Sequence, residues 1–537
     1  MALMKSLSVQ KLFFLFSIVI LKHFRNPKRT IHQENLYTAD HSIASKSEYH
    51  KFQVLGQRQE LEDKFLIFNV ETALLRSSSL FPYFFLVAFE AGSPIRAFIF
   101  LILYPFITLC RDDHALKLMV MICFFGLSKE RFREGRAVLP KFFLENVGRE
   151  SFEVLRRGKK TVGVSNLPQV MVESFLRDHL DIDYVVGKEL KVFCGYFVGL
   201  MEERRELVPD NVLSNAVGIS GCKNKKYFDC PWFAHCKEIY LVSEQERRNW
   251  HQLPSNSYTK PLIFHDGRLA FRPSFLSALA MFMWLPMGFT LGILRTLIAI
   301  TLPLGIAIPL MHITGIKLRV SKPESSSNSS SKGNDDKAKR TLYVCNHKTL
   351  LDPILVSYAT RSTTLTAVTY SLSRMSEIIS PIRTVRLTRH KDQDAELMHK
   401  LLSQSDLVVC PEGTTCREPY LLRFSPLFSE ISNDVFLVAV NCHVSMFYGT
   451  TARGLKFLDP LFFLMNPWPS YSGRFLGMTR SNGDADAKKS RFEVADFVQS
   501  EIAKALGFTC TKLTRKDKYL ILAGNDGVVR DGNRRTS

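Results

Sequence analysis

A histidine and an aspartate in the second half of the chain have the residue types and the spacing of a catalytic pair. His347 and Asp352 lie five positions apart in the segment TLYVCNHKTLLDP, which begins with a predicted strand at Leu342–Cys345. If a helix begins at 350–352, the carboxylate can fold back onto the imidazole, fix its tautomer and leave the other ring nitrogen as a base. Because the H-x4-D pattern is weak by itself, its interpretation depends on the segments that follow.

Two later segments have the composition of phosphate-binding and oxyanion-binding loops. Arg383, Arg386 and Arg389 recur at every third position, a spacing that indicates a loop or an irregular strand edge. Such a run could aim guanidinium groups at a phosphate, and a solvated basic patch is the alternative. The predicted strand Asp406–Cys410 then enters the turn PEGTTCR, residues 411–417. The backbone N–H groups and hydroxyls of such a turn suit a phosphate or a developing oxyanion.

The elements that must position these residues indicate two α/β domains. In the first, over 61–260, short apolar or β-branched runs alternate with charged helical stretches such as 130–157. This alternation predicts a parallel sheet. Its expected strands are 65–70, 161–165, 183–187, 216–220 and 238–242. A second α/β domain, over 341–510, is expected to contain the site and a further strand at 435–440.

Long apolar runs indicate membrane-embedded helices. The strongest is 275–316, where 20 residues without a charge are followed, after Arg295, by 21 more. Glycines and prolines would break or kink these helices, so two joined spans and a re-entrant pair are both open. The apolar segment 97–127 is too short for two spans. It predicts a helical hairpin that dips into one leaflet, with an ordinary buried hairpin as the alternative.

The segments at the two ends and between the domains are basic or polar. The N-terminal segment 1–60 holds ten apolar residues, Leu12–Leu21, between lysines and arginines. This pattern predicts a short interfacial anchor, with a mitochondrial presequence as the alternative. The stretch 321–340 is low in complexity and predicts a flexible linker, and 511–537 is expected to be a basic tail.

The overall composition limits the function classes. With 537 residues, of which 46% are apolar, the chain can bury more than one core, which excludes global disorder. The formal charge of +20 predicts an anionic partner, and 41 phenylalanines with the long apolar runs favour a lipid bilayer over nucleic acid. Eleven cysteines without a C-x-x-C pair indicate neither a zinc ribbon nor a disulfide framework. Cys345, Cys410 and Cys416 are expected to be structural because no base is paired with them.

The chemistry-bearing segments, taken in order, resemble a known enzyme family. NHKTLLDP, the arginine block, VVCPEGTTCREPYLLRF and VFLVAVNCHVSMFYGTTARGLKFLDPLFFLMNP are similar to the four acyltransferase motifs of glycerolipid biosynthesis, and in detail to the land-plant glycerol-3-phosphate sn-2-acyltransferases. The closing TRKDKYLILAGNDG also matches this family, so the resemblance runs from about Phe65 to Gly527. One departure is Lys348, where many acyltransferases have arginine; lysine keeps the charge but loses the bidentate fork.

By the same resemblance, the N-terminal domain is expected to have the fold of haloacid-dehalogenase phosphatases. Where an active member reads D-x-D-G-T, this chain has Asn69 and Glu71 in place of the two aspartates, and asparagine cannot form the acyl-phosphate. Ser165 takes the second-motif position, while Gly221 and Lys225 replace the aspartates of the metal motif. Because Mg²⁺ needs hard carboxylate oxygens, we expect a folded phosphatase domain with no metal and no activity.

The resemblance implies acyl transfer from acyl-CoA to glycerol 3-phosphate, at sn-2, with lysophosphatidic acid as the product. In this reaction His347, oriented by Asp352, removes the proton from the attacking hydroxyl, and backbone donors near Gly413 and Thr414 hold the oxyanion. The residues expected to bind the substrates are Lys348, Arg383, Arg386, Arg389, Glu412, Gly413, Thr414 and Arg417. No tightly held cofactor is expected, since acyl-CoA is consumed as a substrate.

Two other functions stay open at the level of the sequence. A lysophosphatidate acyltransferase would carry the same motifs and take a larger acceptor. A membrane scaffold with two inactive domains is disfavoured, because His347, Asp352, Glu412 and Gly413 are all present. The expected location is the membrane of the endoplasmic reticulum, with mitochondria as the alternative.

Overall fold

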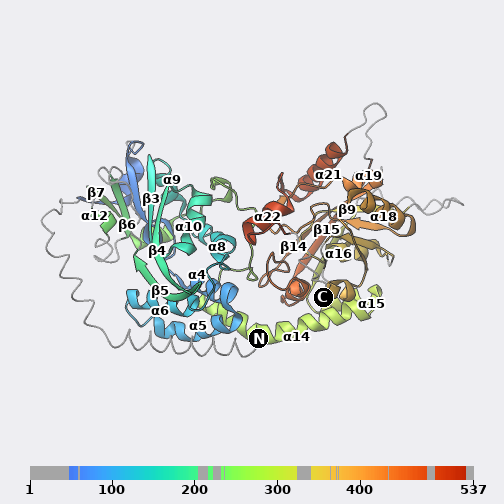
Figure 1. Ribbon diagram of the computed structural model, residues 1–537, viewed down its shortest axis with the longest axis horizontal. Coiled ribbons are helices and arrows are strands. Elements are labelled where there is room, and N and C mark those ends of the chain that lie inside the picture. The colour runs from blue at the N-terminus through green and yellow to red at the C-terminus, as the bar shows by residue number, and fades with distance from the viewer. Residues whose placement is uncertain are drawn as a thin grey trace, which may run out of the picture. The chain divides into compact units, whose positions relative to one another are not determined.

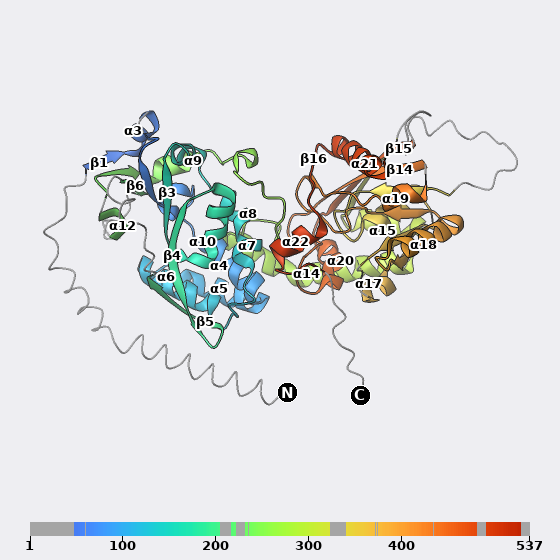
Figure 2. The same cartoon turned by 45° about the horizontal axis from the view of Figure 1, so that its top comes forward.

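The computed structural model forms two compact units, each described here by itself (Figures 1 and 2). Unit 1 consists of Met1–Gly135 and Phe142–Lys260, and unit 2 of Arg136–Lys141 and Pro261–Ser537. The structure describes residues 48–58, 61–203, 216–221, 231–234, 236–322, 340–362, 364–370, 372, 374–432, 434–480 and 490–527. The expected anchor at Leu12–Leu21, the predicted metal-motif residue Lys225 and most of the expected linker lie outside the described residues.

Unit 1 is built on a seven-stranded sheet with the strand order β1-β7-β6-β2-β3-β4-β5. The strands are β1 (Glu48–Lys51), β2 (Phe65–Asn69), β3 (Lys160–Pro168), β4 (Tyr184–Phe193), β5 (Tyr196–Glu203), β6 (Ala216–Gly221) and β7 (Glu238–Val242). All neighbours are parallel except β4 and β5. Continuous apolar runs suit this sheet because parallel strands are covered on both faces, and every residue of β6 is buried. The five strands expected in this domain coincide with β2, β3, β4, β6 and β7.

The helices of unit 1 are short apart from one apolar pair. They are α3 (Phe52–Gln57), α4 (Phe81–Leu86), α5 (Pro94–Ile107), α6 (Asp112–Phe124), α9 (Arg149–Leu155), α10 (Gln169–Ser174), α12 (Pro231–Ala234) and α13 (Glu244–Asn249). The chain passes between the units at α7 (Glu134–Ala137) and α8 (Leu139–Leu144). The expected hairpin at 97–127 is the pair α5 and α6. One side of α5 is buried, and the other exposes Ile95, Phe98, Ile99, Ile102, Leu103 and Phe106.

Unit 2 contains a second seven-stranded sheet, with the order β11-β10-β12-β9-β14-β15-β8. Its strands are β8 (Lys317–Ser321), β9 (Leu342–Cys345), β10 (Thr366–Thr369), β11 (Arg383–Arg386), β12 (Leu407–Val409), β14 (Asp434–His443) and β15 (Ser470–Arg480). Only the pair β14 and β15 is antiparallel among these neighbours. Strand β9 therefore lies at the centre of the sheet, between β12 and β14. The edge strand β8 comes from before residue 341, where this domain was expected to begin.

Helices cover both faces of the sheet in unit 2. They are α16 (Asp352–Thr360), α17 (Arg374–Ile379), α18 (Lys391–Gln404), α19 (Leu427–Ile431), α20 (Asp459–Leu464), α21 (Arg491–Leu506) and α22 (Arg515–Leu522), and a small pair is formed by β13 (Tyr420–Leu421) and β16 (Thr509–Cys510). Because side chains alternate along a strand, Leu342 and Val344 face the core under α18, α19 and α21, whereas Cys345 faces the core under α16 and α20.

The apolar run 275–316 forms one long helix and one short helix. Helix α14 (Phe275–Thr301) has 27 residues, and among the described residues it is the one helix long and apolar enough to cross a membrane. Helix α15 (Leu304–Ile313) has ten residues, fewer than the ~20 that a span requires. Of the two arrangements left open by the sequence, two joined spans do not fit, because the chain turns at Leu302 and Pro303 and α15 ends after ten residues, whereas a re-entrant pair stays a prediction.

A fully buried arginine holds α14 to the rest of unit 2. The side chain of Arg295 is 0% exposed, and it donates to the carbonyl oxygens of Leu464 (2.5 Å), Asn466 (2.7 Å) and Pro467 (3.2 Å) and to that of Thr314. Small residues on the same side of the helix let it approach α20. Figure 1 shows α14 running along one side of unit 2. The one charge in the apolar run is thus a docking group rather than a break between two spans.

Replacing Arg295 by leucine is expected to destabilise unit 2 by about 3 kcal/mol or more, because four buried carbonyl oxygens lose their donor. Thermal unfolding of the detergent-solubilised protein measures the effect. Arg319→Leu is the matched control, since Arg319 is exposed on β8. Equal unfolding temperatures for the two variants would show that Arg295 does not hold α14 in place.

Candidate active site

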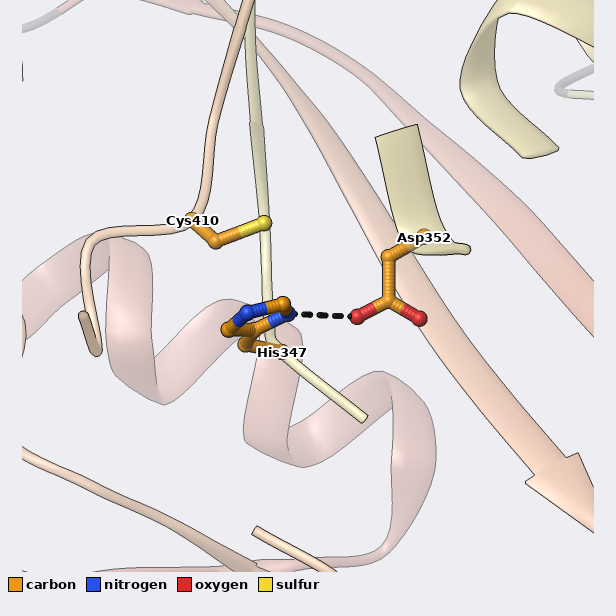
Figure 3. Close-up of side chains that lie close together, drawn as sticks. All are labelled: His347, Asp352 and Cys410. Atoms are coloured by element: carbon orange, nitrogen blue, oxygen red, sulfur yellow. Dashed lines mark hydrogen bonds and ion pairs between the residues drawn. The ribbon is translucent and has the colours of Figure 1, made fainter. Parts of the chain in front are cut away.

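The structure brings the predicted pair together in unit 2. The Nδ1 atom of His347 lies 2.8 Å from the Oδ2 atom of Asp352, as Figure 3 shows. His347 follows the central strand β9, and Asp352 is the first residue of α16. The carboxylate of Asp352 is fully buried and also accepts the backbone N–H groups of Lys348 (2.7 Å) and Thr349 (3.0 Å) and the hydroxyl of Tyr471. The carboxylate therefore fixes both the turn and the tautomer of the imidazole, which leaves Nε2 as the base.

The turn PEGTTCR holds the backbone of the histidine from the other side. Glu412 is buried, and its carboxylate accepts the N–H groups of His347 (2.7 Å) and Leu422 (2.9 Å). The N–H group of Cys416 donates to the carbonyl oxygen of His347 (2.9 Å). Burial raises the pKa of Glu412 to about 7, although these N–H groups and the nearby cationic groups oppose the shift. Glu412 therefore positions the backbone of His347. It is not among the described residues that line the cavity beside His347.

Cys410 lies beside His347, and this corrects the expectation that no base is paired with a cysteine near the motifs (Figure 3). Strand β12 lies next to β9, so Cys410 and Cys345 lie side by side, with 3.4 Å between their sulfur atoms. The bond to Cys345 and burial raise the pKa of Cys410 well above its usual value, although His347 opposes the shift. Burial alone lowers the pKa of His347, but Cys410 and Asp352 raise it well above its usual value. Asp352 is the charged partner in that shift.

A cavity of about 760 Å³ opens beside this pair, within the size range of ligand pockets. Its walls come from many segments of unit 2, including α16 and residues 367–387, and three of its regions bear on the chemistry. The first is apolar and belongs to α14 and α15, including Ile293, Leu297, Ile300, Ala307 and Met311. The second surrounds the candidate base, with His347, Cys410, Gly413, Thr414 and Thr415. The third is the segment 456–461 with Tyr519 of α22. The cavity therefore joins an apolar groove to the candidate base.

Two of the residues expected to bind substrate line this cavity. They are Gly413 and Thr414. Gly413 has φ +63°, a left-handed conformation that favours glycine, and its N–H group donates to the carbonyl oxygen of Cys410 (3.1 Å). This conformation closes the turn and directs Thr414 into the cavity wall.

Two other predicted cations are used inside the protein. Lys348 is buried, and its Nζ donates to the carbonyl oxygens of Arg417 (3.0 Å) and Glu418 (2.9 Å). The side chain of Arg417 is 8% exposed, and it donates to the hydroxyl and the carbonyl oxygen of Thr450 and to the carbonyl oxygen of Gly267 (2.8 Å). Both bind backbone in this structure, and their roles in substrate binding stay predictions.

The arginine block lies at the edge of the sheet. Arg383 and Arg386 begin and end the edge strand β11, and Arg389 follows it; all three are exposed. Arg386 forms an ion pair with Glu377 (2.8 Å). None of the three is among the described residues that line the cavity, and their assignment to substrate binding stays a prediction.

Three residues of the site escaped sequence reasoning. Tyr471 donates to Asp352 from β15, and no sequence signal marks it. Lys456 and Tyr519 line the cavity, and the Nζ of Lys456 donates to the hydroxyl of Tyr519 (2.7 Å). Both lie in segments that the family resemblance had singled out, but without any role attached to them.

The phosphatase-like positions of unit 1 also come together. Asn69 accepts the N–H (2.9 Å) and the hydroxyl (2.8 Å) of Thr72, whose hydroxyl in turn accepts the N–H of Gly221 (3.0 Å). The Oε1 atom of Glu71 accepts the hydroxyl of Ser165 and the N–H groups of Asn166 (3.0 Å) and Leu167 (3.3 Å). Three donors that could bind a phosphate oxygen thus bind the chain's own carboxylate. Burial raises the pKa of Glu71, although these donors oppose the shift.

Comparisons with known proteins agree with this arrangement. A family model described as "Glycerol-3-phosphate acyltransferase RAM2-like, HAD-like domain" matches residues 65–242, and one described as "Acyltransferase" matches 317–443. The probable glycerol-3-phosphate acyltransferase 3 of Arabidopsis thaliana is 50% identical over 535 residues, which is 97% of this chain and 98% of that protein. The glycerol-3-phosphate acyltransferase RAM2 of Petunia hybrida is 39% identical over 481 residues, 86% of this chain and 97% of that protein.

Solved structures match each unit more distantly. A phosphoserine phosphatase in the apo form is 16% identical, with a TM-score of 0.22, and the match covers 33% of this chain and 86% of that one. The 1-acyl-sn-glycerophosphate acyltransferase PlsC from Thermotoga maritima is 13% identical, with a TM-score of 0.23, over 43% of this chain and 89% of that one. TM-scores this low carry no argument about function.

Fold and site together define an α/β acyltransferase joined to a phosphatase-like α/β domain, which confirms the expected fold class. The chain belongs to the plant glycerol-3-phosphate acyltransferase family, as the motifs predicted.

Replacing Asp352 by asparagine is expected to lower turnover at least about 10²-fold, because the imidazole loses the carboxylate that orients it. The variant also tests the pKa of the base. His347 acts as a base only when it is neutral, and Asp352 raises its pKa, so the rising limb of kcat/KM against pH should move to lower pH in the variant. Asp392→Asn, on the exposed side of α18, is the control. An unshifted limb would show that Asp352 does not set the pKa of the base.

Proposed function

We propose that the chain transfers an acyl group from acyl-CoA to the sn-2 hydroxyl of glycerol 3-phosphate and releases lysophosphatidic acid. One observation carries this proposal: the base of a buried carboxylate–imidazole pair lines the same cavity as an apolar groove. The groove suits an acyl chain, and the base suits an alcohol acceptor. Membership of a family whose relatives are named for glycerol 3-phosphate supports this choice of acceptor.

In this reaction the base and the turn have separate roles. Nε2 of His347 removes the proton of the acceptor hydroxyl as the oxygen attacks the thioester carbonyl. The N–H group of Gly413 already donates to the carbonyl oxygen of Cys410 within the turn. We therefore assign the binding of the oxyanion to the backbone N–H group of Thr414. The tetrahedral intermediate then collapses, the thiolate of CoA leaves, and the imidazolium returns the proton to it. The bond to Cys345 and burial raise the pKa of Cys410, so we assign this thiol no nucleophilic role and the proposed reaction passes through no acyl-enzyme. CoA is consumed, and no bound cofactor takes part.

We propose that α14 embeds the enzyme in a membrane, with the endoplasmic reticulum as the expected location and mitochondria as the alternative. One side of this helix docks on unit 2, and large apolar side chains elsewhere on it are exposed, including Leu276, Met283, Met287 and Phe289. A helix of this length and composition can be embedded in lipid. The formal charge of +20 suits an anionic leaflet as well as two phosphorylated substrates.

We propose further that unit 1 removes no phosphate. Asn69 stands where a nucleophilic aspartate is needed, and Gly221 supplies no carboxylate for Mg²⁺. The carboxylate of Glu71 occupies the donors of Ser165, Asn166 and Leu167. The phosphatase-like site therefore lacks its nucleophile, and the side chain of Glu71 occupies donor groups that could bind a phosphate.

Purified wild-type protein is expected to convert labelled glycerol 3-phosphate and acyl-CoA into lysophosphatidic acid, with the sn-2 isomer predominating when the isomers are separated by chromatography. His347→Ala should lower the rate at least about 10²-fold, since the general base is lost. His399→Ala is the control, because His399 is exposed on α18. Faster turnover of lysophosphatidic acid than of glycerol 3-phosphate as acceptor would make the chain a lysophosphatidate acyltransferase. Full activity of His347→Ala would refute the mechanism.

The product is expected to keep its phosphate. Purified protein, free of other phosphatases, should release no monoacylglycerol or inorganic phosphate from lysophosphatidic acid, with or without Mg²⁺. The reason is the missing nucleophile at residue 69 and the missing metal ligand at residue 221. Mg²⁺-dependent release of phosphate, lost when unit 1 is altered by Ser165→Ala, would contradict this assignment.

A further inference from the structure

Among the described residues that line the cavity, Lys456 is the only lysine or arginine. The other polar side chains in the lining include His347, Asp459 and several hydroxyl groups. Lys456 lies at the start of the short helical turn Lys456–Leu458, which leads into α20. Its position matters because a phosphate dianion needs a cation within direct reach.

Helix α22 brings Lys456 and the catalytic turn together. The Nζ atom of Lys456 donates to the hydroxyl of Tyr519 (2.7 Å). The preceding residue, Lys518, is buried, and its Nζ donates to the carbonyl oxygen (2.5 Å) and hydroxyl (3.1 Å) of Thr415 and to the hydroxyl of Thr414 (3.3 Å). Two adjacent residues of α22 therefore reach the lysine of the cavity on one side and the turn beside His347 on the other.

The surroundings of Tyr519 show that positive charge collects here. The Nζ of Lys456 lies 4.5 Å from the centre of the Tyr519 ring, and the guanidinium carbon of Arg515 lies 5.2 Å from it. Burial raises the pKa of Tyr519, yet Lys518, Lys456 and Arg515 lower it below its usual value overall. An anion entering beside this hydroxyl would meet a field of the favourable sign.

Glycerol 3-phosphate is short, so its phosphate must lie close to the hydroxyl that His347 deprotonates. A cation that lines the same cavity as His347 is therefore a candidate to bind the phosphate. Lys348 and Arg417 donate to backbone carbonyl oxygens, and the exposed arginines of β11 do not line the cavity. Lys456 is such a cation.

We propose that Lys456 and the hydroxyl of Tyr519 bind the phosphate of the acceptor, with the hydroxyls of Thr414 and Thr415 at the edge of the same site. The proposal rests on the function proposed above. It assigns a binding role to α22, which lies far in sequence from the histidine. It also makes the acceptor site a product of the C-terminal helix and the segment before α20, rather than of the arginine block.

Lys456→Met tests the proposal, because methionine keeps the length of the side chain and removes the charge. We expect the KM for glycerol 3-phosphate to rise about 10-fold or more, while the KM for acyl-CoA changes less than about twofold. Lys456→Arg should restore part of the loss, and Tyr519→Phe should raise the same KM by a smaller factor. Lys400→Met, on the exposed surface of α18, is the control. Thermal unfolding of each variant shows whether it is folded.

Binding without turnover provides the second readout. In the His347→Ala protein, glycerol 3-phosphate should raise the unfolding temperature and glycerol should not, and adding Lys456→Met should abolish the shift. An unchanged KM for glycerol 3-phosphate in Lys456→Met, or a rise in the KM for acyl-CoA instead, would overturn the proposal; the latter would assign Lys456 to a phosphate of CoA. If the wild type transfers no acyl group to glycerol 3-phosphate, the proposed function fails. The binding shift then decides the role of Lys456 by itself.

Discussion

The site depends on one buried negative charge, the carboxylate of Asp352. A carboxylate without solvent is tolerated only when donors surround it, and this one accepts the imidazole of His347, two backbone N–H groups and the hydroxyl of Tyr471. Those same bonds shape the turn between β9 and α16 and set the orientation of the ring. A substitution that removes these hydrogen bonds would therefore disturb both the orientation of the imidazole and the conformation of the turn.

Cations in the motifs of unit 2 differ in their surroundings: some build the framework, Arg383, Arg386 and Arg389 are exposed at the edge of the sheet, and Lys456 faces the cavity. Lys348, Arg417 and Lys518 donate to carbonyl oxygens or hydroxyls inside the protein, where a lysine or arginine can join several strands and loops at once. Lys456 has a half-exposed side chain and lines the cavity. Whether a basic residue in a motif can bind substrate therefore depends on which groups it contacts in the folded protein.

Local patterns predicted what is local. Five strands of the first sheet, the strands β9, β12 and β14 of the second, the start of α16 and the contact of His347 with Asp352 follow from apolar runs and from a spacing of five residues. The errors and omissions all involve partners distant in sequence. Cys410 lies beside His347 because β12 pairs with β9, and this strand order cannot be read from local sequence patterns. Tyr519 meets Lys456 across 63 residues. In the same way, the length of an apolar run did not show that the second helix would end after ten residues.

The connection from α15 to β8 has a mechanical consequence. Only Thr314–Ile316 separate the two elements, and this short link is held by hydrogen bonds from Gly315 to His312, from Ile316 to Met311 and from Lys317 to Pro469. The edge strand of the sheet is therefore coupled rigidly to the apolar helices that line the groove. If the helices are embedded in lipid as proposed, this link would hold the imidazole of His347 at a fixed height relative to the lipid. In the reaction proposed above, the carbonyl of the acyl donor would have to come to that height to react, so the fold would set the depth at which the reaction takes place.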